Sequence, residues 1–189
     1  MRERMDVLES QGEQLQREAK YREALDKYQE LLEFNRNYFG TDSEEYERIS
    51  IKMCELCNLV AMIFLQKDKF DLTLVFLQKA DALACGHPKY LAITLNNKAC
   101  YYRKTGKLRT ALQCLQDALH LEWKSKKEDT LADTYLNLCA VLSQLGRHKE
   151  ALENVLFSVS LLQEEIFTAE KAPTERLLVL TIAYHNLAV

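Results

Sequence analysis

Residues that break helices are scarce in this sequence. Only 5 of the 189 residues are glycine and only 2 are proline, against about 13 and about 9 at average usage. Alternation of β-branched with polar residues, the pattern of half-buried strands, is also rare. These shortages argue against a sheet and predict helix along nearly the whole chain.

Long apolar runs and a leader are missing as well. No stretch of 18 consecutive apolar residues occurs, so no membrane-spanning helix is expected. The first residues, MRERMDVLESQGEQLQRE, are charged and contain no apolar core, unlike a secretory signal. We therefore expect no membrane partner and a cytoplasmic location, with association with the cytoskeleton as one form of it.

Signatures of metal binding and catalysis are absent too. The six cysteines include one close pair, Cys54 and Cys57 in CELC, and no second pair completes a four-ligand zinc set. No glycine-rich phosphate loop, Gly-x-Ser-x-Gly elbow or His-Glu-x-x-His occurs, and the four histidines are scattered. The expectation is a protein that is not an enzyme, without metal or cofactor, whose cysteines are small apolar core residues.

The charge is distributed unevenly. The net charge is −3, but residues 89–127 carry 9 Lys and Arg against 2 Asp and Glu, while residues 1–48 and 128–189 each have a net charge of −5. A basic centre attracts an acidic peptide or faces its acidic neighbours, and the sequence leaves both readings open. The acidic flanks would repel a polyanion, so nucleic acid is not an expected partner.

What the sequence does contain is a repeat. Four pairs of small residues are each 12 positions apart, and a large apolar residue follows each pair four positions later. A polar turn lies inside each pair: EAKY, KDKF, TGKL and LGRH. Two antiparallel helices approach closely only where neither carries a large side chain, so the pattern predicts packed helical hairpins. The pairs and their large partners are Gly12, Ala24 and Tyr28; Ala61, Thr73 and Leu77; Ala99, Ala111 and Leu115; and Cys139, Ala151 and Val155.

This pattern resembles the tetratricopeptide repeat (TPR), most clearly in LAITLNNKACYYRKTGKLRTALQCLQDAL and LADTYLNLCAVLSQLGRHKEALENVLFSV. Successive units are 38 to 49 residues apart, longer than the usual 34, and CGHPKYLAITLNNKA is similar to the extended repeats of kinesin light chains. The resemblance implies an all-α, right-handed superhelical solenoid. We expect one domain over 1–189, with repeats near 5–38, 50–86, 89–124 and 129–166 and a final helix at 174–189 that is truncated or caps the stack.

Two features predict where helices begin. Asp42 with Glu45, and Thr130 with Asp133, have the spacing of N-terminal capping residues. Pro88 suits the first turn of a helix.

Asparagines recur at one position of the first helices. Asn97 and Asn137 lie two residues before the small residue of their units, and Asn186 matches them in the final helix. An amide both donates and accepts, so a row of amides can hold an extended backbone regardless of its side chains. The row resembles the asparagine ladders of peptide-binding TPR domains. The alternative, that these amides fix the register of neighbouring helices, stays open.

The hypothesis is therefore a non-catalytic adaptor or scaffold that binds an extended, acidic or mixed peptide of a protein partner in a concave groove. The alternative is a structural subunit of a cytoskeletal or ciliary assembly that uses its outer faces or ends. Self-association through an apolar end helix also stays open. The residues expected to line the groove are Asn96, Asn97, Cys100, Arg103, Lys104, Asn137, Ala140, Gln144, His185 and Asn186, with Asn58 and Met62 from the preceding unit.

Overall fold

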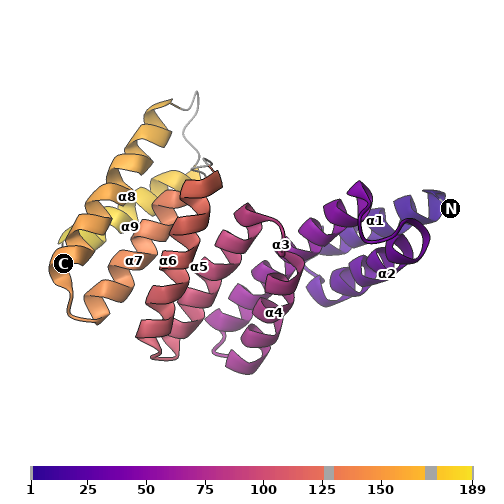
Figure 1. Cartoon of the computed structure of the whole chain (residues 1–189), viewed down its shortest axis with the longest axis horizontal. Coiled ribbons are helices and arrows are strands. Elements are labelled where there is room, and N and C mark those ends of the chain that lie inside the picture. Colours follow the sequence, from indigo (N-terminus) through magenta and orange to yellow (C-terminus); the bar gives the residue numbers. More distant parts are fainter. Residues whose placement is uncertain (1, 126–129, 169–173, 189) are drawn as a thin grey trace. The chain divides into compact units, whose positions relative to one another are not determined.

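The computed structural model describes residues 2–125, 130–168 and 174–188. Every regular element in those ranges is a helix (Figure 1), which confirms the predicted all-α class. The chain divides into two compact units, residues 1–90 and residues 91–189. The helices are α1 (Arg2–Arg17), α2 (Tyr21–Phe39), α3 (Glu44–Gln66), α4 (Phe70–Leu83), α5 (Pro88–Lys104), α6 (Leu108–Ser125), α7 (Leu131–Gln144), α8 (His148–Thr168) and α9 (Thr174–Ala188).

The first unit is built from two helical hairpins, α1 with α2 and α3 with α4. In the first hairpin the small residues Gly12 and Ala24 are buried. A Cβ placed on Gly12 would lie 3.1 Å from Cζ of Tyr28, closer than side chains normally pack. The Tyr28 ring therefore occupies the space that a glycine leaves, as the repeat predicts for large residues beside a close helix crossing.

The turns of the hairpins share one hydrogen-bonding pattern. In the α5–α6 turn, Lys107 N–H donates to Tyr102 O at 2.8 Å and Gly106 N–H to Arg103 O at 3.2 Å, the two bonds of a Schellman motif. Gly106 has a φ of 77°, which glycine adopts at no steric cost. The equivalent residue of the α1–α2 turn is Ala19, which has a φ of 57°. The backbone thus repeats the turn even where the sequence does not supply glycine.

Helix α3 is the most apolar long helix of the first unit. Among the described residues it is the one helix with the length and composition to cross a membrane, and 56% of its most apolar window is buried within the structure. Its neighbours α2 and α4 pack against it, and residues such as Ile49, Met53 and Cys57 are fully buried. Burial raises the pKa of the Cys57 thiol to about 12, so this cysteine stays a protonated core residue.

The cap of α3 differs from the sequence prediction. Ser43, not Asp42, is the N-cap, and its Oγ accepts a hydrogen bond from Tyr46 N–H at 3.2 Å. Asp42 instead accepts a hydrogen bond from the hydroxyl of Thr41. The prediction was one residue early because both Asp42 and Ser43 are good capping residues, and the turn at Gly40 decides which of them enters the helix.

Ion pairs connect α1 to α3 within the first unit. Arg48 donates two hydrogen bonds to the carboxylate of Glu9, and Lys52 Nζ lies 2.8 Å from Oε1 of Glu13. The hydrogen bonds from Arg48 hold the pKa of Glu9 at about 2, well below its ordinary value. A carboxyl that strongly favours its ionised form in the fold stabilises this arrangement at neutral pH.

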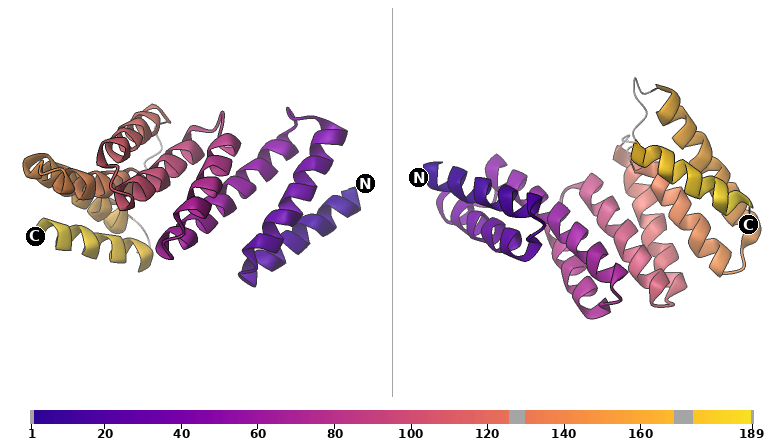
Figure 2. Two further views of the ribbon diagram at one scale, coloured as in Figure 1. Left: turned by 90° about the horizontal axis from the view of Figure 1, so that it is seen from below. Right: turned by 180° about the vertical axis from the view of Figure 1, so that it is seen from behind.

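The second unit contains most of α5 together with α6, α7, α8 and α9 (Figure 2). The small residues Ala99 and Ala111, and Cys139 and Ala151, are all at most 5% exposed, as expected at close helix crossings. Ser158 on α8 donates a hydrogen bond from its Oγ to the carbonyl of Ala132 on α7 at 2.8 Å. This bond satisfies a completely buried hydroxyl and fixes the register of α7 against α8.

Arginine holds α9 on α7 and α8. Nη1 of Arg176 lies 2.8 Å from Oδ2 of Asp133 on α7, and its Nε lies 2.9 Å from Oε2 of Glu165 on α8. The Arg176 side chain is only 20% exposed, so these ion pairs are partly shielded from water. Further along α9, the hydroxyl of Tyr184 accepts a hydrogen bond from Gln163 at 2.6 Å.

Candidate functional site

The strongest polar feature of the second unit is a chain of side-chain hydrogen bonds that starts at Asn96. This residue is 8% exposed, and its Nδ2 donates to the carbonyl of Ala92 at 3.2 Å and to Oγ1 of Thr134 at 2.7 Å. Its Oδ1 accepts a hydrogen bond from Nδ2 of Asn137 at 3.1 Å. Both N–H groups and the oxygen of Asn96 are therefore used within the fold, and they connect α5 to α7.

A buried carboxylate lies at one end of this chain. Glu122 on α6 is 4% exposed, and its Oε1 accepts hydrogen bonds from the hydroxyls of Thr134, at 3.0 Å, and Thr130. Burial raises the pKa of the Glu122 carboxyl, and the two threonine bonds oppose that rise. Thr130 is the N-cap residue of α7, as predicted, but its side chain makes no capping bond and instead donates a hydrogen bond to the carboxylate of Glu122.

Asn137 lies at the other end of the chain. It is half-buried, and its Oδ1 is 3.9 Å from Sγ of Cys100, a distance at which a thiol donates a weak hydrogen bond. Burial raises the pKa of the Cys100 thiol, so the proton needed for this bond is retained. The polarity of the whole chain then runs one way, from Cys100 through Asn137, Asn96 and Thr134 to the carboxylate, and it sets the orientation of the Asn137 amide.

A cavity of about 550 Å³ lies beside α7, α8 and the end of α9. Asn137, Ala140 and Gln144 are spaced by three and four residues on α7 and so share one face of the helix. The cavity begins on that face, one turn beyond Asn137. Three predicted groove residues, Ala140, Gln144 and Asn186, are brought together in its wall. The residues that line it are Cys139, Ala140, Ser143, Gln144, His148, Ala151, Leu152, Val155 and Asn186.

The two predicted basic residues lie on α5, beyond the amides. Arg103 and Lys104 follow Cys100 by three and four positions, which places them one turn further along the same side of the helix. Arg103 is half-buried and Lys104 is exposed. Asn97 is half-buried on the same helix, one residue after Asn96.

The remaining predicted residues are placed differently. Asn58 belongs to the first unit, is 6% exposed and donates a hydrogen bond to the carbonyl of Cys54 at 3.2 Å. Met62, one turn later on α3, is half-buried. His185 lies on α9 and is exposed, and it is not part of the cavity wall.

Sequence reasoning missed Glu122 and Thr134 as members of the polar chain. Neither belongs to a motif, and Glu122 resembles any carboxylate on a charged helix. The one available signal was a charged residue at a position of α6 where the helical spacing predicts an apolar one. Glu122 follows Leu115 and Ala118 at spacings of seven and four residues, so it occupies a core position of α6. The described residues hold no group of three or more His, Cys, Asp or Glu side chains arranged to bind a metal ion.

Comparison with known proteins connects this architecture to solved structures only. No model of a known protein family matches the sequence, and no curated protein sequence matches it. The chain is similar to BtubC (BKLC) from P. vanneervenii, with 18% identity over 89% of this chain and 66% of that chain, and a TM-score of 0.60. The chain thus spans just under two thirds of that protein structure.

Two further structures have the same kind of fold. One contains kinesin-light-chain TPR-like repeats from Podosopora anserina, with 14% identity, 98% of this chain and 87% of that chain covered, and a TM-score of 0.55. The other is MamA, with 16% identity, 100% and 85% covered, and a TM-score of 0.55. The predicted TPR-type solenoid fold is therefore confirmed.

Proposed function

We propose that the protein is a scaffold that binds an extended segment of a protein partner along α5 and α7 of the second unit. The observation that carries the proposal is the Asn137 amide, which is held by Asn96 and Cys100 on the face that leads into the cavity. A fixed amide can pair with a peptide backbone without first losing side-chain freedom. The TPR-type fold supports a role in protein interactions.

The chemistry of the neighbouring side chains defines the segment. Arg103 and Lys104, with the excess of 9 basic over 2 acidic residues in 89–127, favour an acidic or mixed sequence. Ala140, Cys139 and Val155 give the cavity an apolar wall that suits one apolar side chain. We infer an extended peptide in which acidic residues flank an apolar anchor.

A double substitution tests this function. Asn97→Ala with Asn137→Ala removes two amides, and binding of a captured partner peptide should weaken roughly 10- to 100-fold because up to four backbone hydrogen bonds are lost. The partner is captured with a photo-crosslinking residue at Gln144, and the same residue at exposed Gln113 on α6 serves as the control position.

Circular dichroism separates the outcomes. Asn137→Ala also removes the bond to Asn96, so a loss of stability of about 1–2 kcal/mol is expected from the substitution itself. Lost binding in a protein that is destabilised by no more than this and is still folded supports the proposal. Retained binding, or crosslinking that is equal from Gln144 and Gln113, contradicts it, because neither the amides nor the cavity would then contact the partner.

A structural subunit is the second candidate, and exposed apolar side chains on the last two helices favour it. Phe167 is 86% exposed, and Leu178 and Ile182, one turn apart on α9, are 63% and 45% exposed. Such side chains are typical of an interface with another subunit. If this reading holds, Leu178→Glu abolishes incorporation into the assembly, whereas the asparagine variants leave it intact.

A further inference from the structure

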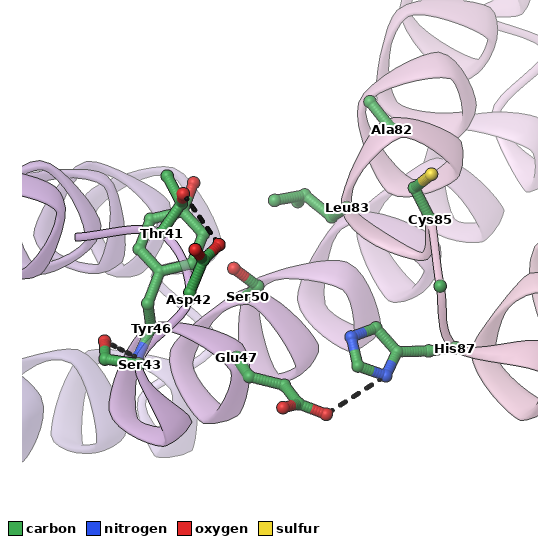
Figure 3. Close-up of a pocket in the computed structure, with 11 residues that line it drawn as sticks. Thr41, Asp42, Ser43, Tyr46, Glu47, Ser50, Ala82, Leu83, Cys85 and His87 are labelled. Carbon is green, nitrogen blue, oxygen red and sulfur yellow. Dashed lines mark hydrogen bonds and ion pairs between the residues drawn. The ribbon is translucent and has the colours of Figure 1, made fainter.

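The first unit contains a polar pocket that has no part in the proposed function. Its volume is about 430 Å³, and three segments form it: the α2–α3 connection, the first turns of α3, and the end of α4 with the loop that follows (Figure 3). We call it the Ser50 pocket. Its lining residues are Thr41, Asp42, Ser43, Tyr46, Glu47, Ser50, Ala82, Leu83, Cys85, Gly86 and His87.

Ser50 is the residue that the fold leaves unexplained. It is 6% exposed, and its Oγ has no hydrogen-bond partner. A serine hydroxyl in a helix normally donates to a nearby carbonyl or to another side chain, as Ser158 does. A buried polar group without a partner costs free energy, and natural proteins keep few of them. In Figure 3 the hydroxyl points toward the part of the pocket that Asp42 and Tyr46 line, where its oxygen can accept a hydrogen bond from a donor on a bound group.

The wall of the pocket is negatively charged. Asp42 and Glu47 contribute two carboxylates from neighbouring turns, and Oε1 of Glu47 lies 3.4 Å from Nδ1 of His87 across the pocket. The first unit as a whole has 13 Lys and Arg against 17 Asp and Glu, a net charge of −4. An anion would be repelled here, and a cation would be attracted.

The end of α4 adds to this field. Ala82 and Leu83 form the last turn of α4 and line the pocket, so the C-terminal, negative end of the helix dipole lies at its edge. Cations are stabilised at helix C-termini and anions at N-termini such as the first turn of α3, which also lines the pocket, so the two helix ends oppose each other and the carboxylates decide the sign of the pocket. The side chains of Leu83 and Tyr46 supply apolar surface on the two sides of the pocket (Figure 3).

We propose that the Ser50 pocket binds an arginine side chain of a partner protein. A guanidinium has five N–H donors in a planar fork, so it can donate to the Ser50 oxygen and to a carboxylate of the pocket wall at the same time, whereas a lysine offers one point charge. The aliphatic stem of the arginine lies between Tyr46 and Leu83. A metal ion is disfavoured, because the described residues include no set of three metal-ligating side chains.

The test is an NMR titration of the full chain with Nα-acetyl-arginine N-methylamide. Backbone amides of Ser50, Gly86 and His87 should shift and saturate in the millimolar range, as expected for a single side chain. Nα-acetyl-citrulline N-methylamide has the same shape without the charge, and its affinity should be lower by a factor of roughly five or more. Equal shifts with both compounds, or shifts confined to other residues, would overturn the proposal.

Substitutions sharpen the assignment. Asp42→Asn and Glu47→Gln should each weaken arginine binding roughly three-fold, the size of a partly exposed ion pair. The double change Asn97→Ala with Asn137→Ala lies in the second unit and should leave arginine binding unchanged. Because the two sites are tested by separate variants, the arginine proposal can be refuted while the peptide proposal stands, and the reverse.

Ser50→Ala distinguishes a binding role from a structural one. Because the hydroxyl has no partner in the free protein, its removal should raise the melting temperature by roughly 2–4 °C while weakening arginine binding roughly three- to ten-fold. Ser158→Ala is the matched control: it removes a hydroxyl bonded to Ala132 O at 2.8 Å, so it should lower the melting temperature and leave binding unchanged. A Ser50→Ala protein that melts earlier and binds arginine normally would refute the proposal.

Discussion

The hydrogen-bond chain through Asn96 leads to the most direct prediction about the second unit. Asn96→Ala removes an amide that donates to Ala92 O and Thr134 Oγ1 and accepts from Asn137. The bond to Ala92 is local to α5, whereas the other two join α5 to α7. The substitution therefore tests whether a polar contact, and not apolar packing alone, holds these helices together.

The expected loss follows from these contacts. Each bond between the two helices contributes about 1 kcal/mol net, and the buried groups left behind on Thr134 and Asn137 add about 1 kcal/mol more. Alanine recovers about 0.6 kcal/mol as a better helix former than asparagine. The free energy of unfolding of the second unit should fall by about 2 kcal/mol, which corresponds to a melting temperature lower by roughly 8–16 °C for a unit of about 100 residues.

The assay is urea unfolding followed by tryptophan fluorescence. Trp123 is the only tryptophan of the chain and lies on α6 next to Glu122, so its signal reports the second unit. Asn154→Ala is the matched control, because the Asn154 amide makes one local bond, to Glu150 O at 2.7 Å. Its effect should stay within about 0.5 kcal/mol. If Asn96→Ala costs no more than Asn154→Ala, the chain does not hold α5 to α7.

Three further predictions concern pH and turn conformation. Because Arg48 holds the pKa of Glu9 at about 2, its contribution, on the order of 2–3 kcal/mol, is present above pH 4.5 and lost as the pH falls toward 2; Glu9→Gln should abolish this acid-dependent step in urea unfolding. Burial raises the pKa of Glu122, so stability falls as the pH rises above 4.5, and Glu122→Gln should be more stable at neutral pH, with the difference closing below pH 4.5. Gly106→Ala should cost about 1 kcal/mol, and Ala19→Gly should gain a similar amount, because both positions have positive φ. Thermal melts in which Gly106→Ala is not destabilised, or Ala19→Gly is not stabilised, would refute this.

The turns between paired helices could be predicted from the local sequence. Gly106 and Gly146 mark two of the turns, and Ala19 and Asp68 occupy the equivalent left-handed positions in the other two. The 12-residue spacing located all four, although only two have the residue that a turn of this type prefers. The cap of α3 was misplaced by one residue because Asp42 and Ser43 compete as caps and the preceding turn selects between them.

The candidate site was less accessible from the sequence. The row of Asn97, Asn137 and Asn186 was recognisable from its spacing, but the partner of Asn137 is Asn96, which lies outside that row. Neighbouring positions on a helix differ by about 100°, so Asn97 points to a different side of α5 from Asn96, which faces α7. Ser50 gives no sequence signal at all, because an unpartnered hydroxyl is defined by what surrounds it.

The order of amino acids by itself determined the hairpins of this protein. Helix propensity, small residues 12 positions apart and turn chemistry all act over a dozen residues or fewer, and they agree with one another. Only the tertiary structure decided which polar groups are satisfied. Asn96 finds its partners 38 and 41 residues away and Ser50 finds none, because a hydrogen bond depends on the positions of two side chains that only packing brings within hydrogen-bonding distance of each other.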